Sequence, residues 1–153
     1  MTKDEALKAL EAAGSAQTRK TYARHGIGPN MFGVSYAALG KLEKQIKRDH
    51  ALARQLWITG NHDARVLATM IADPAQADDT LLERWVRDLD NSTLVGAFAK
   101  LAASTPLAHA KAAAWANDDD EWLGDTGWTM LSVLAMEDAS LPDPFFEPWL
   151  ETI

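Results

Sequence analysis

The stretch DHALARQLWITGNHDARVLATMIADP, residues 49–74, decides the fold. Apolar residues recur at spacings of three and four in both of its halves, which is typical of amphipathic helices. Asp49 and Asn61 are each placed to cap a helix, Gly60 separates the two, and Asp73-Pro74 ends the second. The stretch therefore predicts a pair of consecutive helices joined by a short loop.

The same pattern extends over the rest of the chain, with short breaks at Gly, Pro, Asn and Asp. Thr2-Lys3-Asp4-Glu5 and Thr80-Leu81-Leu82-Glu83 fit the capping box, in which hydroxyl and carboxylate satisfy backbone N–H groups. Pro106 suits the first position of a helix, and residues 142–153 predict a last short one. The pattern predicts about ten helices, and no segment alternates with a period of two, so a sheet is not expected.

Helices of similar length joined by short loops form either a compact bundle or a stack of hairpins. The stack is favoured because consecutive helices pair along the chain, and degenerate HEAT-like repeats often lack a fixed sequence period. We therefore predict an all-α fold, a HEAT-like superhelix of helical hairpins, as one domain over residues 1–153. Such an array has a concave face on which a partner can bind.

The composition excludes several classes of protein. There is no cysteine, which rules out disulfides, thiolate zinc sites and a cysteine nucleophile. Residues 1–11 lack the apolar core of a secretion signal, and no run reaches the roughly 18 apolar residues of a membrane span, so a cytoplasmic protein without a membrane partner is expected. GxGxxG, Walker A, HExxH and GxSxG motifs are absent, and no cofactor is expected.

The formal net charge of −7 argues at first against a nucleic-acid partner. The charge is unevenly distributed, however. Residues 1–65 contain 11 Lys+Arg and 6 Asp+Glu, a balance of +5, and residues 66–153 contain 4 and 16, a balance of −12. A basic face that binds anions is therefore compatible with the acidic total.

Two groups of residues resemble metal sites but are better explained otherwise. His50 and the pair His62-Asp63 fall on different helices without a second pair at ligand spacing, so we expect capping or surface roles for them and no metal. The acidic run from Asp118 to Glu121 is typical of a solvated helix start.

Basic residues of the first half are the candidate nucleic-acid site. Lys41, Lys44, Lys47 and Arg48 are expected on one face of a helix whose apolar face includes Tyr36, and they are joined by Arg19, Lys20 and Arg24 on the preceding helix. Each such cation can neutralise a phosphate. An ordinary solvated face is the alternative.

The six tryptophans allow two interpretations. Trp57, Trp85 and Trp128 fall in apolar stripes and are expected in the core. Trp115, Trp122 and Trp149 lie near helix ends, where an aromatic ring can also line a cleft and stack on a base.

Several stretches together resemble the AlkD-type DNA alkylation repair family, which are DNA glycosylases built from HEAT-like repeats. The match follows the chain in order over nearly all of its length, which makes it informative about the fold. The residues that carry the resemblance are His25-Gly26, Phe32-Gly33-Val34, Asp49-His50, Leu52-Ala53, Leu56-Trp57, residues 62–68, Asp73-Pro74, residues 85–88, Glu121-Trp122, Gly127-Trp128 and residues 131–138.

The positions that the resemblance implies for catalysis and DNA contact have changed. The family carries Trp-Asp-x-x-Asp, whose second Asp stabilises positive charge on the sugar as the base leaves. Here Ser92 stands for the Trp and Gly96 for that Asp. The family's DNA-contacting Arg is replaced by Asp125, and the chain covers about two-thirds of the family's usual extent. Asp88 and Asp90 are poor substitutes, because they differ from position 96 in both height and face of a helix.

The resemblance and the replacements together predict a member of this family that lacks glycosylase activity, with no catalytic residue assigned. We expect it to bind nucleic acid weakly through its basic N-terminal part. Two alternatives remain open: a non-enzymatic scaffold that binds a protein on its concave face, and an active alkylpurine DNA glycosylase.

Overall fold

The computed structural model describes residues 1–137, and the helix predicted at 142–153 lies outside them. The described residues form nine α-helices and no strand, which confirms the all-α prediction. The helices are α1 (Lys3–Ala13), α2 (Ala16–Arg24), α3 (Tyr36–Ile46), α4 (His50–Trp57), α5 (His62–Ile71), α6 (Asp79–Arg87), α7 (Ser92–Ala103), α8 (Ala108–Ala116) and α9 (Glu121–Glu137). Among these residues no helix is long and apolar enough to cross a membrane.

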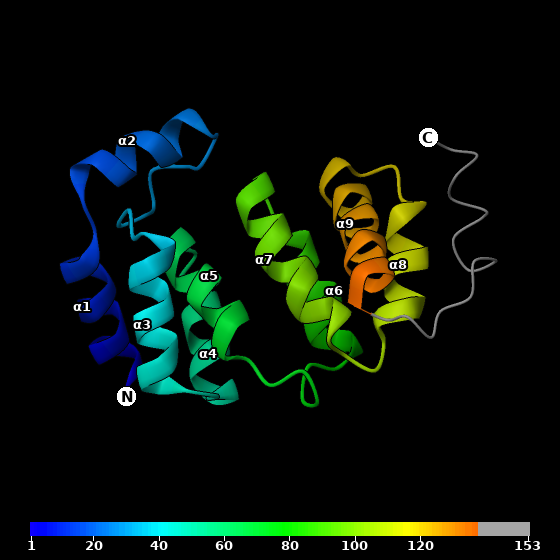
Figure 1. Cartoon of the computed structure of the whole chain (residues 1–153), viewed down its shortest axis with the longest axis horizontal. Coiled ribbons are helices and arrows are strands. Elements are labelled where there is room, and N and C mark those ends of the chain that lie inside the picture. The colour runs from blue at the N-terminus through cyan, green and yellow to red at the C-terminus, as the bar shows by residue number, and fades with distance from the viewer. Residues whose placement is uncertain (138–153) are drawn as a thin grey trace.

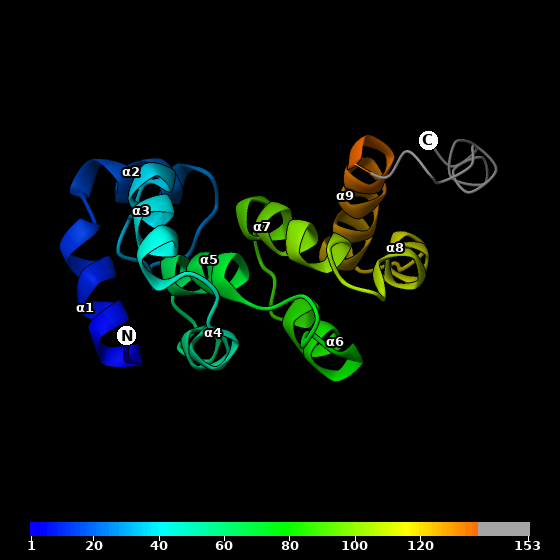
Figure 2. The ribbon, with the colours of Figure 1, turned by 60° about the horizontal axis from the view of Figure 1, so that its bottom comes forward.

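The helices are arranged as stacked hairpins (Figure 1). The outer helices α4, α6 and α8 pack on α5, α7 and α9, respectively. The inner helices form a row in which α3 packs on α5, α5 on α7 and α7 on α9. Figure 2 shows this inner row as a concave layer, with α3 and α9 standing higher than α5 and α7 between them. The predicted HEAT-like superhelix is confirmed.

Local signals place most helix starts correctly. The capping box at Thr2 is present, and Ser15, Asp49 and Asn61 cap their helices through side-chain oxygens. These caps depend on residues three positions apart, which is why they can be recognised in the sequence alone.

Two predicted helix starts are wrong. The Asp78 carboxylate accepts the Leu81 N–H at 2.9 Å and caps α6, so Thr80 is inside the helix and does not begin a capping box. The carboxylate is preferred because the N-terminal end of a helix favours negative charge. Pro106 lies in a turn, and α8 begins two residues later at Ala108.

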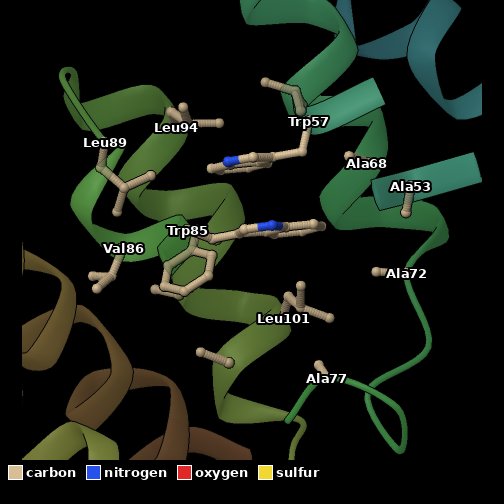
Figure 3. Close-up of a cluster of buried hydrophobic side chains, with 14 of the residues drawn as sticks. Ala53, Trp57, Ala68, Ala72, Ala77, Trp85, Val86, Leu89, Leu94 and Leu101 are labelled. Carbon is tan, nitrogen blue, oxygen red and sulfur yellow. The ribbon is translucent and has the colours of Figure 1, made fainter. Parts of the chain in front are cut away.

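A stack of two tryptophans joins neighbouring hairpins in the core. The rings of Trp57 and Trp85 are parallel, with centroids 4.2 Å apart (Figure 3). The Trp57 Nε1–H donates to the Asp88 carboxylate at 2.8 Å. Both residues are buried as predicted, and so is Trp115. Trp122 and Trp128 are partly buried against the same core, and Trp149 lies outside the described residues.

Candidate nucleic-acid interface

One buried carboxylate organises the basic end of the molecule. Asp63 on α5 is fully buried and accepts three backbone N–H groups, those of Phe32 at 2.6 Å, Gly33 at 3.0 Å and Val34 at 2.9 Å. The predicted capping or surface role of His62 and Asp63 is therefore wrong, since both are buried and Asn61 caps α5. The carboxylate is stable inside because hydrogen bonds replace its hydration.

The segment held by Asp63 in turn holds α2. The Ser15 N–H bonds to the Gly33 carbonyl at 3.1 Å, the Arg19 Nη1 group donates to the Phe32 carbonyl at 3.1 Å, and the Tyr22 hydroxyl donates to the Val34 carbonyl. No residue of α2 is buried. Since a helix normally gains its stability by burying an apolar face, α2 depends for its position largely on these hydrogen bonds and on the partly buried Tyr22, whose ring packs edge-on against His62.

The basic residues predicted on α2 are accessible. Arg19, Lys20 and Arg24 are all exposed, and the first two line a shallow depression together with Ile27 and Pro29. Arg19 is both a structural donor and a surface cation. The helix therefore presents positive charge to solvent beside an apolar patch.

The second basic group does not form one helix face, contrary to the prediction. Lys41 and Lys44 are exposed on α3, but the helix ends at Ile46, and Lys47 adopts a positive φ of 64°. Arg48 lies beyond this turn, where Nη1 is 3.5 Å from the Ala72 carbonyl and 3.7 Å from the Asp73 carboxylate. The turn sends Arg48 toward α5, because the positive φ at Lys47 redirects the chain.

Arg48 lines a hollow of about 450 Å³ on the concave layer. Tyr36 and Glu43 of α3 and Gly96 and Lys100 of α7 also line it. We call it the concave hollow. Tyr36 was expected on the apolar face of α3 but is 59% exposed.

Sequence reasoning missed Tyr36 and Lys100 as candidate site residues. Ser92, Gly96 and Lys100 are exposed and follow one another at intervals of four along α7. Residues four apart share a helix face, so the spacing from Gly96 was the signal that would have identified Lys100. The position of Tyr36 had no such signal, because its exposure depends on how α3 packs on α5.

The two helix faces explain why Lys41 and Lys44 are not in the hollow. At 100° per residue, Lys41 lies about 160° around α3 from Glu43, and Lys44 lies about 100° from it. These two lysines therefore extend positive charge along the outside of α3. Within the hollow, the described cations are Arg48 and Lys100.

The α9 end of the concave layer is acidic. Asp120 caps α9 by accepting the Trp122 and Leu123 N–H groups at 3.0 and 3.1 Å, which confirms the predicted helix start. Glu121 and Asp125 are exposed one turn apart. Carboxylates at these positions repel phosphate.

No group of three or more possible metal ligands gathers among the described residues. His50 accepts the Asp73 N–H through Nδ1 at 3.2 Å, and Asp63 is occupied by backbone donors. The two histidines considered in the sequence therefore have separate surroundings.

Stacked helical hairpins with a charged hollow on the inner row define a HEAT-like repeat protein. The chain matches the model of the family described as DNA alkylation repair enzyme over residues 6–153, and it belongs to that family. This confirms the resemblance drawn from the sequence. None of the curated proteins matches the sequence closely enough to count as a relative.

A solved structure is also similar to this chain, with a TM-score of 0.94 and 28% sequence identity. It is described as "A new family of proteins related to the HEAT-like repeat DNA glycosylases with affinity for branched DNA structures". The match covers 99% of this chain and 66% of that chain, so this chain spans slightly less than two thirds of the length of that relative.

Proposed function

We propose that this protein binds DNA, including branched DNA, on its concave face without removing bases. The observation that carries the proposal is the composition of the concave hollow. Arg48, Lys100 and the Tyr36 ring surround it, while Gly96 stands where the family has its carboxylate. The hollow therefore offers two cations that can contact a phosphate backbone, whereas the group that stabilises a sugar cation is replaced.

The space above Gly96 supports the absence of base excision. A Cβ built on Gly96 meets no atom within 4 Å, so the space beside this position is open and no side chain is packed against it. Asp88 is engaged by the Trp57 Nε1–H at 2.8 Å and by Arg65 at 3.8 Å. Glu43 comes from α3, which is separated from α7 by α5.

The charge distribution supports binding at the α2–α3 end. Arg19, Lys20 and Arg24 on α2, and Lys41, Lys44 and Lys47 at α3, add exposed cations to Arg48. The relative with affinity for branched DNA shares this fold. A DNA strand that crosses the concave layer from this end meets cations first and the carboxylates of α9 last.

The test is the salt dependence of binding to duplex and branched DNA. Arg48→Gln/Lys100→Gln removes two charges from the hollow, and Lys41→Gln/Lys44→Gln removes two from the outside of α3. Lys3→Gln/Lys8→Gln on α1 is the matched control, because both lysines are exposed and the change in net charge is equal. We expect the slope of log K against log salt to fall by about 0.9 for each phosphate that is no longer neutralised.

Two results would contradict the proposal. Absence of binding at low salt would remove the DNA function and leave a protein partner on the concave face as the alternative. Release of a methylated purine from duplex DNA by the purified protein would show that base excision persists without a carboxylate at position 96.

A further inference from the structure

A second, smaller cavity lies where the loop after α2 meets the N-terminal ends of α5 and α7. In Figure 1 both helix ends point toward this loop. The cavity has a volume of about 200 Å³ and shares no lining residue with the concave hollow. Ile27, Pro29 and Leu94 provide apolar walls, and polar groups come from Asn30, His62 and Asp90. We call it the α5–α7 cavity.

His62 supplies a polar atom without a partner. His62 is one of the residues that line the cavity and is 5% exposed, and its Nδ1 is covered by protein atoms and has no hydrogen-bond partner among the described residues. The ring is held edge-on against Tyr22, with centroids 5.5 Å apart. Burial lowers the pKa of His62, although Asp63 and Asp90 oppose the effect, and this favours the neutral ring. A buried polar nitrogen gains stability when a bound ligand pairs with it.

The charges around the cavity favour a neutral polar ligand over an anion. Arg65 and Asp90, which have opposite charges, both line it. The helix ends that would otherwise attract an anion are already capped, because the Asn61 and Asn91 side chains accept the Ala64 and Leu94 N–H groups at 3.0 and 2.8 Å. Phosphate would have to displace these caps and approach a carboxylate.

Arg65 has a fixed position at this site. Its Nε group donates to the Trp57 carbonyl at 3.1 Å, and its guanidinium lies over the Trp57 ring. Nη1 also donates to the Asp88 carbonyl at 3.4 Å, and Nη2 lies 3.8 Å from the Asp88 carboxylate. The N–H groups that these contacts leave over belong to a side chain that is already ordered, which reduces the entropic cost of binding a ligand.

We propose that the α5–α7 cavity receives one unpaired nucleobase of a bound DNA strand. A base has flat apolar faces for the Ile27, Pro29 and Leu94 walls, and a neutral edge that contains both donors and acceptors. His62, Arg65 and Asp90 provide the complementary groups. A volume of about 200 Å³ is smaller than a pocket for a drug-sized molecule and suits a single heterocycle.

The surroundings of the cavity agree with this ligand. Ile27 and Pro29 also line the depression that contains Arg19 and Lys20, so cations for the strand backbone adjoin the cavity. On the other side, Asn91 immediately precedes the exposed row of α7 that leads to Gly96 and the concave hollow. Unpaired bases are available at the branch points of DNA, where extrusion costs less than from a paired duplex.

This inference rests on the proposed DNA binding, and its test separates the two. 2-Aminopurine is placed at an unpaired branch position of a DNA junction, and its fluorescence and the binding affinity are measured on the full chain. Gly28→Phe adds a ring at the exposed edge of the cavity: Gly28 is a lining residue, and a Cβ there meets nothing within 4 Å. Ala114→Phe on α8 is the control, because it adds the same ring at an exposed position outside the lining.

We expect the fluorescence to change on binding to the unaltered protein, and Gly28→Phe to abolish that change. We also expect Gly28→Phe to reduce the preference for unpaired over fully paired DNA by about tenfold, while Ala114→Phe has no effect. Asp90→Asn, which preserves the shape of the side chain, should weaken the same preference severalfold.

Two outcomes would overturn the base-binding inference alone: the protein binds DNA without a change in fluorescence, or Gly28→Phe and the Ala114→Phe control respond equally. Failure of the unaltered protein to bind any of these DNA molecules overturns the proposed function as well. Thermal unfolding of each variant verifies that the fold is retained.

Discussion

The two ends of the concave layer differ in both charge and construction. At the α2–α5 end, exposed cations are carried by a helix without buried residues, and hydrogen bonds to the segment 32–34 hold it. At the α8–α9 end, carboxylates are exposed, and the helices are packed so closely that a Cβ on Gly127 would overlap the backbone of Ala116.

This difference assigns the two ends to different tasks: the α8–α9 end stabilises the fold, and the α2–α5 end carries the cations for binding. Close packing occurs at both ends, since a Cβ on Gly14 would overlap the Phe32 carbonyl, but at the basic end the helix that carries the cations has no buried residue and is held by directional bonds. Directional bonds hold an exposed helix in place without covering its surface, which leaves the cations of α2 accessible. Removing the acceptor of such a bond is costly, because the buried donor is then left unsatisfied.

The largest expected effect comes from Asp63→Ala, which removes the carboxylate behind the segment 32–34. Two buried N–H groups and the partly buried one of Phe32 lose their acceptor. Each unsatisfied buried group costs about 1–3 kcal/mol, so we expect stability to fall by at least about 2 kcal/mol. Urea unfolding measures the change, and hydrogen exchange should accelerate first at residues 32–34 and in α2. Unchanged exchange there would show that α2 is held by other interactions.

A smaller effect is expected from Glu83→Gln, which tests the other end. Glu83 of α6 accepts hydrogen bonds from Lys111 Nζ at 2.7 Å and Trp115 Nε1 at 3.2 Å, and Lys111 also pairs with Asp79. The bond from Lys111 lowers the pKa of Glu83, although burial opposes it. We expect the free energy of unfolding to fall by about 1–3 kcal/mol at pH 7.

The direction of the Glu83 pKa shift determines how this stabilisation depends on pH. The pKa of Glu83 is lower in the folded state than its ordinary value of 4.5. The stabilisation is therefore complete above the unfolded-state pKa and is lost as the pH falls through the folded-state pKa. Chemical unfolding at several pH values should show a weaker acid dependence for Glu83→Gln than for the unaltered protein, and parallel curves would exclude this role.

The smallest effect is expected from Asp125→Arg, which makes the two ends more alike. Asp125 is exposed on α9, and its carbonyl, not its carboxylate, accepts the Thr129 hydroxyl. The change should leave the thermal midpoint nearly constant and increase DNA affinity severalfold at low salt, with a salt slope steeper by about 0.9. An unchanged slope would place DNA away from the α9 end.

Sequence reasoning identified the helices and the family but only part of the candidate site. The exposed cations of α2 were predicted, whereas Lys41, Lys44, Lys47 and Arg48 were wrongly assigned to one helix face, because the turn at Lys47 has no clear sequence signal. Asp63 was missed as the organising residue, since its partners lie 29 to 31 positions earlier in the chain.

Helix starts, apolar stripes and the replacement of the family's carboxylate by Gly96 can all be recognised in the order of residues, because caps and periodicity act within one or two turns. Burial of Asp63, exposure of Tyr36 and the meeting of Arg48 with Lys100 arise from the stacking of α3, α5 and α7. These features depend on interactions between segments distant in the chain, and such interactions are formed when whole helix faces pack together.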